Sequence, residues 1–127
     1  MPAKEPDSEQ RRILVVDDNE DAARTLAMLL RLKGHEVQVV FSGLQALAAG
    51  PQFLPGIVLM DLGMPEMNGI EAAREIRRTS WGEHVKLVTI TGWGQEDDKR
   101  GTREAGFDHH LVKPVEAQDL LQLLEQL

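Results

Sequence analysis

The sequence predicts an α/β protein in which helices cover both faces of one doubly wound parallel sheet. Short aliphatic runs recur along the chain, and a segment with helical spacing of apolar residues follows each run. Residues 13–16 (ILVV) and 57–60 (IVLM) show no polar alternation, which is typical of strands that are buried on both faces. Strands that a helix separates run parallel, because the helix returns the chain to the edge where the next strand begins.

The first half of the chain contains three predicted strands and two predicted helices. The strands are residues 13–16, 35–41 and 56–61, and the helices are residues 19–34 and 43–50. In the first helix, Ala23, Leu26 and Leu30 recur at helical spacing. Asn19 has the side chain of an N-cap and Gly34 is typical of a helix end, so both boundaries of this helix are predicted.

The second half continues the alternation with two strands and three helices. The strands are residues 85–91 and 109–112, and the helices are residues 70–79, 95–106 and 116–127. The helix at residues 95–106 has few apolar residues and an internal Gly101, which costs about 1 kcal/mol relative to alanine. We therefore expect this helix to be loosely held, and a helix that shifts between two states and a merely solvated helix are equal alternatives for it.

Composition restricts the class of protein and its partners. The 127 residues carry a net charge of −7, which argues against a protein that binds nucleic-acid phosphates or anionic membranes. Cysteine is absent, so disulfides and thiolate chemistry are excluded. No apolar run reaches the roughly 20 residues of a spanning helix, and the N-terminus lacks the apolar segment of a signal peptide. We expect a cytoplasmic protein with a flexible N-terminal tail, residues 1–11, and one domain, residues 12–127.

Polar side chains stand where four of the predicted strands end. Asp17 and Asp18 follow the first strand, Asp61 ends the third, Thr91 ends the fourth and Lys113 follows the fifth. Ligands of doubly wound sheets bind at the carboxyl ends of the strands, so we expect these side chains to form one site. Adjacent carboxylates at the mouth of a buried strand repel each other unless a cation or hydrogen-bond donors face them.

Each of these residues also has an ordinary explanation when it is taken alone. The two adjacent aspartates could cap the first helix, Thr91 could be a β-branched strand residue, and Lys113 could be a solvated surface lysine. The ordinary explanations fail together, because they give no reason for acids, a hydroxyl and a lysine to end four strands at one edge. The joint arrangement therefore favours a functional site.

Four motifs, VVDD, LMDLGMPEMNG, TITGWG and LVKP, occur in this order and each at a strand end. Together they resemble the receiver domain of two-component response regulators, of single-domain or hybrid-kinase type, and the match runs from Arg12 to Leu127. The resemblance implies a flavodoxin-like (CheY-like) fold with five helices and five strands in the order 2-1-3-4-5. It also implies signal transduction through a phosphorelay, in which Asp61 accepts a phosphoryl group from phosphohistidine.

The acidic residues predict a divalent metal site. Clustered carboxylates would repel an incoming phosphoryl dianion unless a divalent cation lay beside the acceptor. Magnesium, or manganese in its place, prefers octahedral oxygen ligands and suits such a cluster. The expected ligands are Asp17, Asp18, Asp61 and the backbone carbonyl of Gly63.

The remaining motif residues are expected to hold or modulate the phosphoryl group. Lys113 would bind its oxygens as an ammonium, and Thr91 would donate a hydroxyl hydrogen bond. Pro114 restricts the backbone beside Lys113, and the resemblance implies a cis bond between them. Gly92 leaves the approach to the oxygens open, and the resemblance implies that Trp93 influences how water reaches the acyl phosphate. A surface aromatic held by loop packing is an equal alternative for Trp93.

His110 stands where the resemblance places a switch residue that is usually Tyr or Phe. A histidine departs from that pattern, and we expect packing in the core or at the edge of the sheet as its main role. Neighbouring residues on a strand face opposite ways, so His109 and His110 are not expected to chelate one zinc ion.

These observations predict a signalling phosphoacceptor that catalyses only its own phosphorylation and slow dephosphorylation, and is not otherwise an enzyme. Its expected partners are a histidine kinase or histidine phosphotransfer domain, and a downstream protein that binds the face of the fourth helix, fifth strand and fifth helix. A phosphorylation-independent interaction module with a receiver fold is the main alternative. A nucleotide- or flavin-binding domain is disfavoured, because the anionic stretch at residues 17–22 stands where a phosphate loop would lie.

Overall fold

The structure is a computed structural model that describes residues 10–62, 69–91 and 104–127. Its strands are β1 (Arg12–Val16), β2 (Glu36–Val40), β3 (Ile57–Asp61), β4 (Lys86–Thr91) and β5 (His109–Val112). Its helices are α1 (Glu20–Leu32), α2 (Gly43–Phe53), α3 (Gly69–Arg77) and α5 (Ala117–Gln126). The predicted helix at residues 95–106 lies almost entirely outside the described residues. None of the described helices combines the length and apolar character that crossing a membrane requires.

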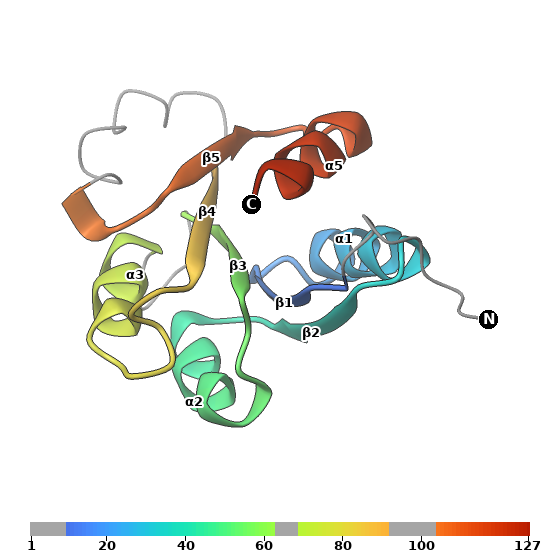
Figure 1. Ribbon diagram of the computed structural model, residues 1–127. Coiled ribbons are helices and arrows are strands. Elements are labelled where there is room, and N and C mark those ends of the chain that lie inside the picture. Colours follow the sequence, from blue (N-terminus) through green and yellow to red (C-terminus); the bar gives the residue numbers. More distant parts are fainter. Residues whose placement is uncertain (1–9, 63–68, 92–103) are drawn as a thin grey trace.

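The strands form one parallel, five-stranded sheet in the order β2-β1-β3-β4-β5. Helices α1 and α5 cover one face of this sheet, and α2 and α3 cover the other (Figure 1). The predicted doubly wound architecture and the predicted strand order are therefore confirmed. Because all strands run parallel, their carboxyl ends lie at one edge of the sheet.

Each face of the sheet has its own apolar core. All residues of Ile13–Val16 are fully buried, and their side chains alternate between the two cores. Ala23 and Leu30 of α1 pack in one core, whereas Ala73 and Ile76 of α3 pack in the other. The lack of polar alternation in the first aliphatic run thus correctly predicted a strand that is buried on both sides.

The ends of α1 agree with the sequence prediction, but the end of α2 does not. The Asn19 side chain accepts a hydrogen bond of 3.1 Å from a first-turn backbone N–H, and Gly34 has a φ of +93° just past the helix. Helix α2 continues to Phe53, although the prediction ended it at Gly50. Pro51 lies in the last turn, where its missing N–H removes only one helical bond, and the buried Phe53 side chain favours continuation.

Arg77 joins the end of α3 to the amino ends of β4 and β5. Its guanidinium donates hydrogen bonds to the carbonyl oxygens of Gly106 (2.6 Å) and Val85 (2.7 Å). It also forms a 2.9 Å ion pair with Asp108, and the same carboxylate oxygen accepts a hydrogen bond from the backbone N–H of Leu87 (2.9 Å). Arginine carries several donors in one planar group, so a single side chain fixes three segments of the chain.

Gly50 packs directly against the indole ring of Trp81. A Cβ atom at position 50 would lie 2.1 Å from two ring carbons of Trp81. Alanine is normally favoured over glycine in a helix interior by about 1 kcal/mol. Here we expect Gly50→Ala to lower the free energy of unfolding by about 1–3 kcal/mol, because the indole must be displaced. Urea unfolding of the variant and the wild type measures this difference.

Gly56→Ala is the matched control for that substitution. Nothing lies within 4 Å of a Cβ atom added at position 56, so the free energy of unfolding should stay the same or rise slightly. Equal stability of the two alanine variants would contradict the close contact between Gly50 and Trp81.

Candidate functional site

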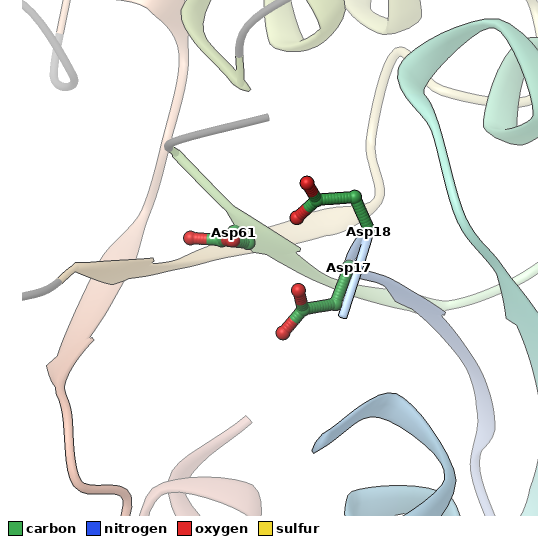
Figure 2. Close-up of side chains that lie close together, drawn as sticks. All are labelled: Asp17, Asp18 and Asp61. Carbon is green, nitrogen blue, oxygen red and sulfur yellow. The ribbon is translucent and has the colours of Figure 1, made fainter. Parts of the chain in front are cut away.

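Three carboxylates meet at the carboxyl edge of the sheet. Strand β1 ends immediately before Asp17, and Asp61 is the last residue of the neighbouring strand β3. Carboxylate oxygens of Asp17, Asp18 and Asp61 lie within 4.8 Å of one another. Figure 2 shows the three side chains gathered at the tips of these two strands. The fold thus brings together acids that are 44 positions apart in the chain (61 − 17 = 44).

The three carboxylates differ in their exposure to solvent. Asp17 is 1% exposed and Asp61 is 6% exposed, whereas Asp18 is an exposed residue. Burial raises the pKa of Asp17 above its ordinary value, and a 3.0 Å hydrogen bond from the backbone N–H of Asn19 offsets this only in part. The negative charge of Asp61 raises the pKa of Asp17 further. A proton or a cation therefore stabilises this cluster.

Lys113 faces the carboxylates from the end of β5. Its Nζ lies 3.5 Å from Oδ1 of Asp61, which is the distance of an ion pair rather than of a short hydrogen bond. The Lys113 side chain is 41% exposed, so its ammonium is still partly hydrated. The Lys113 backbone N–H donates a 2.7 Å hydrogen bond to the carbonyl of Thr91, which joins the end of β5 to the end of β4. The bond between Lys113 and Pro114 is cis, as the resemblance implied.

Thr91 is the last residue of β4 and is 3% exposed. Its hydroxyl lies 3.4 Å from the carbonyl oxygen of Leu111 on β5, which makes a long and weak hydrogen bond. The preceding residue, Ile90, is in register with Asp61, so Thr91 lies one step beyond the acid on the neighbouring strand. A rotation about its side-chain bond is enough to release the hydroxyl from Leu111.

Three predicted site residues, Gly63, Gly92 and Trp93, lie outside the described residues. The backbone carbonyl of Gly63 therefore stays a predicted metal ligand. Gly92 and Trp93 likewise stay predicted modulators of access to the phosphoryl group.

His110 lies on β5, in register with Thr89, and its side chain is exposed. Of the two locations expected for it, the core is excluded because the residue is exposed, whereas its position on the edge strand β5 agrees with the other. His109 is in register with Val88, so the two imidazoles lie on opposite faces of the sheet.

Two features of the site were not predicted. Asn19 donates its backbone N–H to Asp17 in addition to capping α1, and the Asp-x-Asn spacing is the signal that could have indicated such a turn. A groove of about 920 Å³ also opens beside the acids. It is lined by both charged and apolar side chains, including Asp17, Lys113, Leu26, Leu29, Ile90 and Val115. The motifs supply Asp17, Ile90 and Lys113 to its walls, but no motif marks Leu26, Leu29 or Val115, which only the tertiary structure brings beside them.

Comparisons with known proteins agree with this geometry. The family model for the response regulator receiver domain matches residues 13–125. The DNA-binding response regulator MtrA of Mycobacterium tuberculosis is 36% identical over 115 residues, which are 91% of this chain and 49% of MtrA. The chain therefore spans about half the length of that relative.

Two solved structures resemble the whole described fold. The chemotaxis response regulator CheY4 of Vibrio cholerae superposes with a TM-score of 0.86 at 25% identity, over 93% of this chain and 98% of that one. The receiver domain of the sensor histidine kinase PA1611 of Pseudomonas aeruginosa, solved with magnesium coordinated in its active-site cleft, gives a TM-score of 0.83. It is 29% identical, over 93% of this chain and 97% of that one. The fold, the matched residues and the relatives together show that this chain belongs to the response regulator receiver domain family.

Proposed function

We propose that this chain is a phosphoacceptor, in which a phosphoryl group passes from a phosphohistidine to Asp61. The observation that carries the proposal is the meeting of three acids and one lysine at a single sheet edge, with Lys113 Nζ 3.5 Å from Asp61. The acids and the lysine are not members of either apolar core, so packing of the cores does not account for their meeting at this edge. The arrangement suits a group that arrives with negative charge and must be bound from two sides.

The proposed transfer uses the side chains in distinct roles. A carboxylate oxygen of Asp61 attacks phosphorus, the N–P bond of the donor breaks, and the donor imidazole leaves with the electron pair. Lys113 already pairs with the carboxylate and stays beside the phosphoryl oxygens, where it stabilises the charge on them. Thr91 turns its hydroxyl from Leu111 and donates to one of these oxygens. Water later attacks the same phosphorus, which releases phosphate and restores the carboxylate.

The acidic cluster fits a divalent cation. Carboxylates are preferred ligands of magnesium, and those of Asp17, Asp18 and Asp61 are close enough to share one ion. The raised pKa of Asp17 means that these charges are poorly compensated by protein groups alone. Bound there, magnesium or manganese would neutralise charge on the phosphoryl oxygens, and the carbonyl of Gly63 would complete the ligand set. Magnesium in the cleft of the PA1611 receiver domain supports this assignment.

The proposed phosphoacceptor works between two proteins. A histidine kinase or a histidine phosphotransfer domain donates the phosphoryl group at the carboxyl edge of the sheet. A downstream protein then binds the face that includes β5 and α5 when the phosphorylated form changes that face. We place this exchange in the cytoplasm, with residues 12–127 as the receiver domain, and we propose that its chemistry is limited to its own phosphorylation and dephosphorylation.

Incubation with acetyl phosphate and Mg²⁺, followed by intact mass spectrometry, tests the acceptor. The wild type should gain one labile phosphoryl group, and Asp61→Asn should gain none, because an amide is a far poorer nucleophile than a carboxylate. Asp119→Asn removes an exposed acid of α5 and should leave the adduct unchanged. An adduct that persists in Asp61→Asn would place the acceptor elsewhere. A wild type that takes up no phosphoryl group would favour an interaction module that works without phosphorylation.

Magnesium should stabilise the folded protein, because the ion binds the acidic cluster only when the fold assembles it. At a concentration 100 times its Kd, the ion should raise the free energy of unfolding by about 2.7 kcal/mol. Asp17→Asn and Asp18→Asn should both lose most of this gain. Thermal unfolding with Mg²⁺ and with EDTA measures it, and full stabilisation of both variants would contradict the ligand assignment.

The same two variants should differ when no metal is present. A raised folded-state pKa means that Asp17 contributes stability below its ordinary pKa of 3.8, and that this contribution is lost as pH rises through the raised value. Asparagine carries no charge at any pH, so at a pH above the raised pKa Asp17→Asn should unfold at a higher temperature than the wild type in EDTA. Asp18 is exposed, so Asp18→Asn should unfold in EDTA at nearly the same temperature as the wild type. Lower stability of Asp17→Asn at neutral pH would show that its charge is better compensated than described.

A further inference from the structure

Thr89, in the middle of β4, has a buried hydroxyl without a hydrogen-bond partner. The residue is 0% exposed, and its Oγ1 is the one buried side-chain polar atom in the described part of the chain that makes no hydrogen bond. A buried hydroxyl that has lost its bonds to water costs free energy unless the protein replaces them. Valine has nearly the same shape and would carry no such cost. In the form described by this structure, no protein group therefore offsets the cost of burying the Thr89 hydroxyl.

The position of Thr89 in the sheet identifies the group that could bind it. Register pairs place Val40, Val16, Met60, Thr89 and His110 in one row across the five strands. Residues in register on parallel strands project from the same face, so this row is apolar over three strands and polar at the last two. The polar members are therefore direct neighbours on one face.

His110 is the neighbour of Thr89 with an unused hydrogen-bonding group. Its side chain is exposed on the edge strand, and within residues 10–62, 69–91 and 104–127 its imidazole makes no hydrogen bond. A neutral imidazole has one nitrogen that donates and one that accepts, and a hydroxyl can do either, so the pair needs no charged partner.

Thr91 connects this pair to the acidic cluster. It lies two residues after Thr89 and therefore projects from the same face of β4. Its hydroxyl contacts the carbonyl of Leu111, the residue that follows His110. When that hydroxyl turns to a phosphoryl oxygen, the β5 backbone beside His110 loses a bond that is already long.

We propose that Thr89 is a positioning residue, whose hydroxyl holds the His110 imidazole when that side chain turns from solvent onto the sheet in the phosphorylated form. This inference rests on the proposed phosphoacceptor function and names the interaction that stabilises the phosphorylated state. The bond satisfies a hydroxyl that is otherwise unpaired, so the phosphorylated form gains an interaction that the unphosphorylated form lacks. The unpaired Thr89 hydroxyl destabilises the unphosphorylated form, and its hydrogen bond to His110 stabilises the phosphorylated form.

NMR of histidine imidazole nitrogens tests the bond in the full chain, with Mg²⁺ and beryllofluoride as the phosphoryl analogue. The chain has four histidines, and the signals that disappear in a His110→Gln variant are those of His110. His109, on the opposite face of the sheet, serves as the internal control. Beryllofluoride should shift the His110 nitrogens and slow the exchange of the imidazole N–H with water. Thr89→Val should abolish both effects, and Thr89→Ser, which restores a hydroxyl, should recover them.

Beryllofluoride affinity gives a second measure of the same bond. Thr89→Val should raise the unfolding temperature without the analogue and weaken beryllofluoride binding roughly three- to tenfold, the range expected for one net hydrogen bond. In a His110→Phe background the same substitution should no longer weaken binding, because its partner is gone. Equal weakening in both backgrounds would overturn the inference.

The failure of this inference is distinguishable from failure of the proposed function. Fluorine NMR of the same samples shows whether beryllofluoride binds at all. Bound analogue with unchanged His110 nitrogens would overturn the role of Thr89 and leave the phosphoacceptor intact. Absence of binding in the wild type, together with absence of a phosphoryl adduct, would overturn both.

Discussion

The carboxylates of Asp17 and Asp61 repel each other at the tips of two adjacent strands, β1 and β3, which are buried apart from Arg12 at the start of β1. Neither strand can move away, because each is paired on both sides and packed between two layers of helices. The charge must therefore be compensated from beyond the strand tips. Lys113 does this in part, from a position that still contacts solvent. A divalent cation is the ligand that would complete the compensation, and it would also allow an anionic phosphoryl group to approach.

Two poorly satisfied groups stand out among the described residues, and the register places one of them, Thr89, level with Val16, the residue directly before the other, Asp17. Asp17 is a buried acid whose pKa is raised, and Thr89 is a buried threonine whose hydroxyl is unpaired. Shifted pKa values and local departures from the packing rules are concentrated at functional sites. The apolar rows beneath them hold the sheet in one register, which allows the fold to tolerate both. The apolar rows of the sheet thus stabilise the fold, whereas the polar residues near the carboxyl ends of the strands are available to bind a ligand.

Local sequence patterns predicted which helices and strands form more reliably than where each one ends or what it packs against. The uninterrupted run at residues 13–16 indicated a strand with two buried faces, and Asn19 marked the start of α1, because both signals act over a few residues. The strand order was implied by the family resemblance rather than by periodicity. The end of α2 was missed because Pro51 suggests termination, whereas the burial of Phe53 depends on contacts from elsewhere in the chain.

For the candidate site, the sequence predicted which residues meet at the sheet edge but not how deeply each of them is buried. The rule that polar residues gather at the carboxyl ends of parallel strands placed the acids, Thr91 and Lys113 at one edge. The strand order implied by the resemblance placed the fifth strand at an edge, but it did not decide between core and edge packing for His110, because the exposure of one side chain depends on its neighbours in space. Burial of Asp17 beside an exposed Asp18 and the unpaired Thr89 hydroxyl likewise depend on packing that no short motif encodes.

The Arg77 contacts determine where β4 and β5 are able to separate. Its guanidinium and the Asp108 carboxylate tie the amino ends of these strands together, while their carboxyl ends are joined by the Lys113–Thr91 backbone bond and the long Thr91–Leu111 contact. The amino ends of this strand pair therefore carry more side-chain ties than the carboxyl ends, and the four residues of β5, at about 3.3 Å each, span roughly 13 Å between them. A ligand that draws the Thr91 hydroxyl away from Leu111 would act on the end of the pair that has fewer such ties.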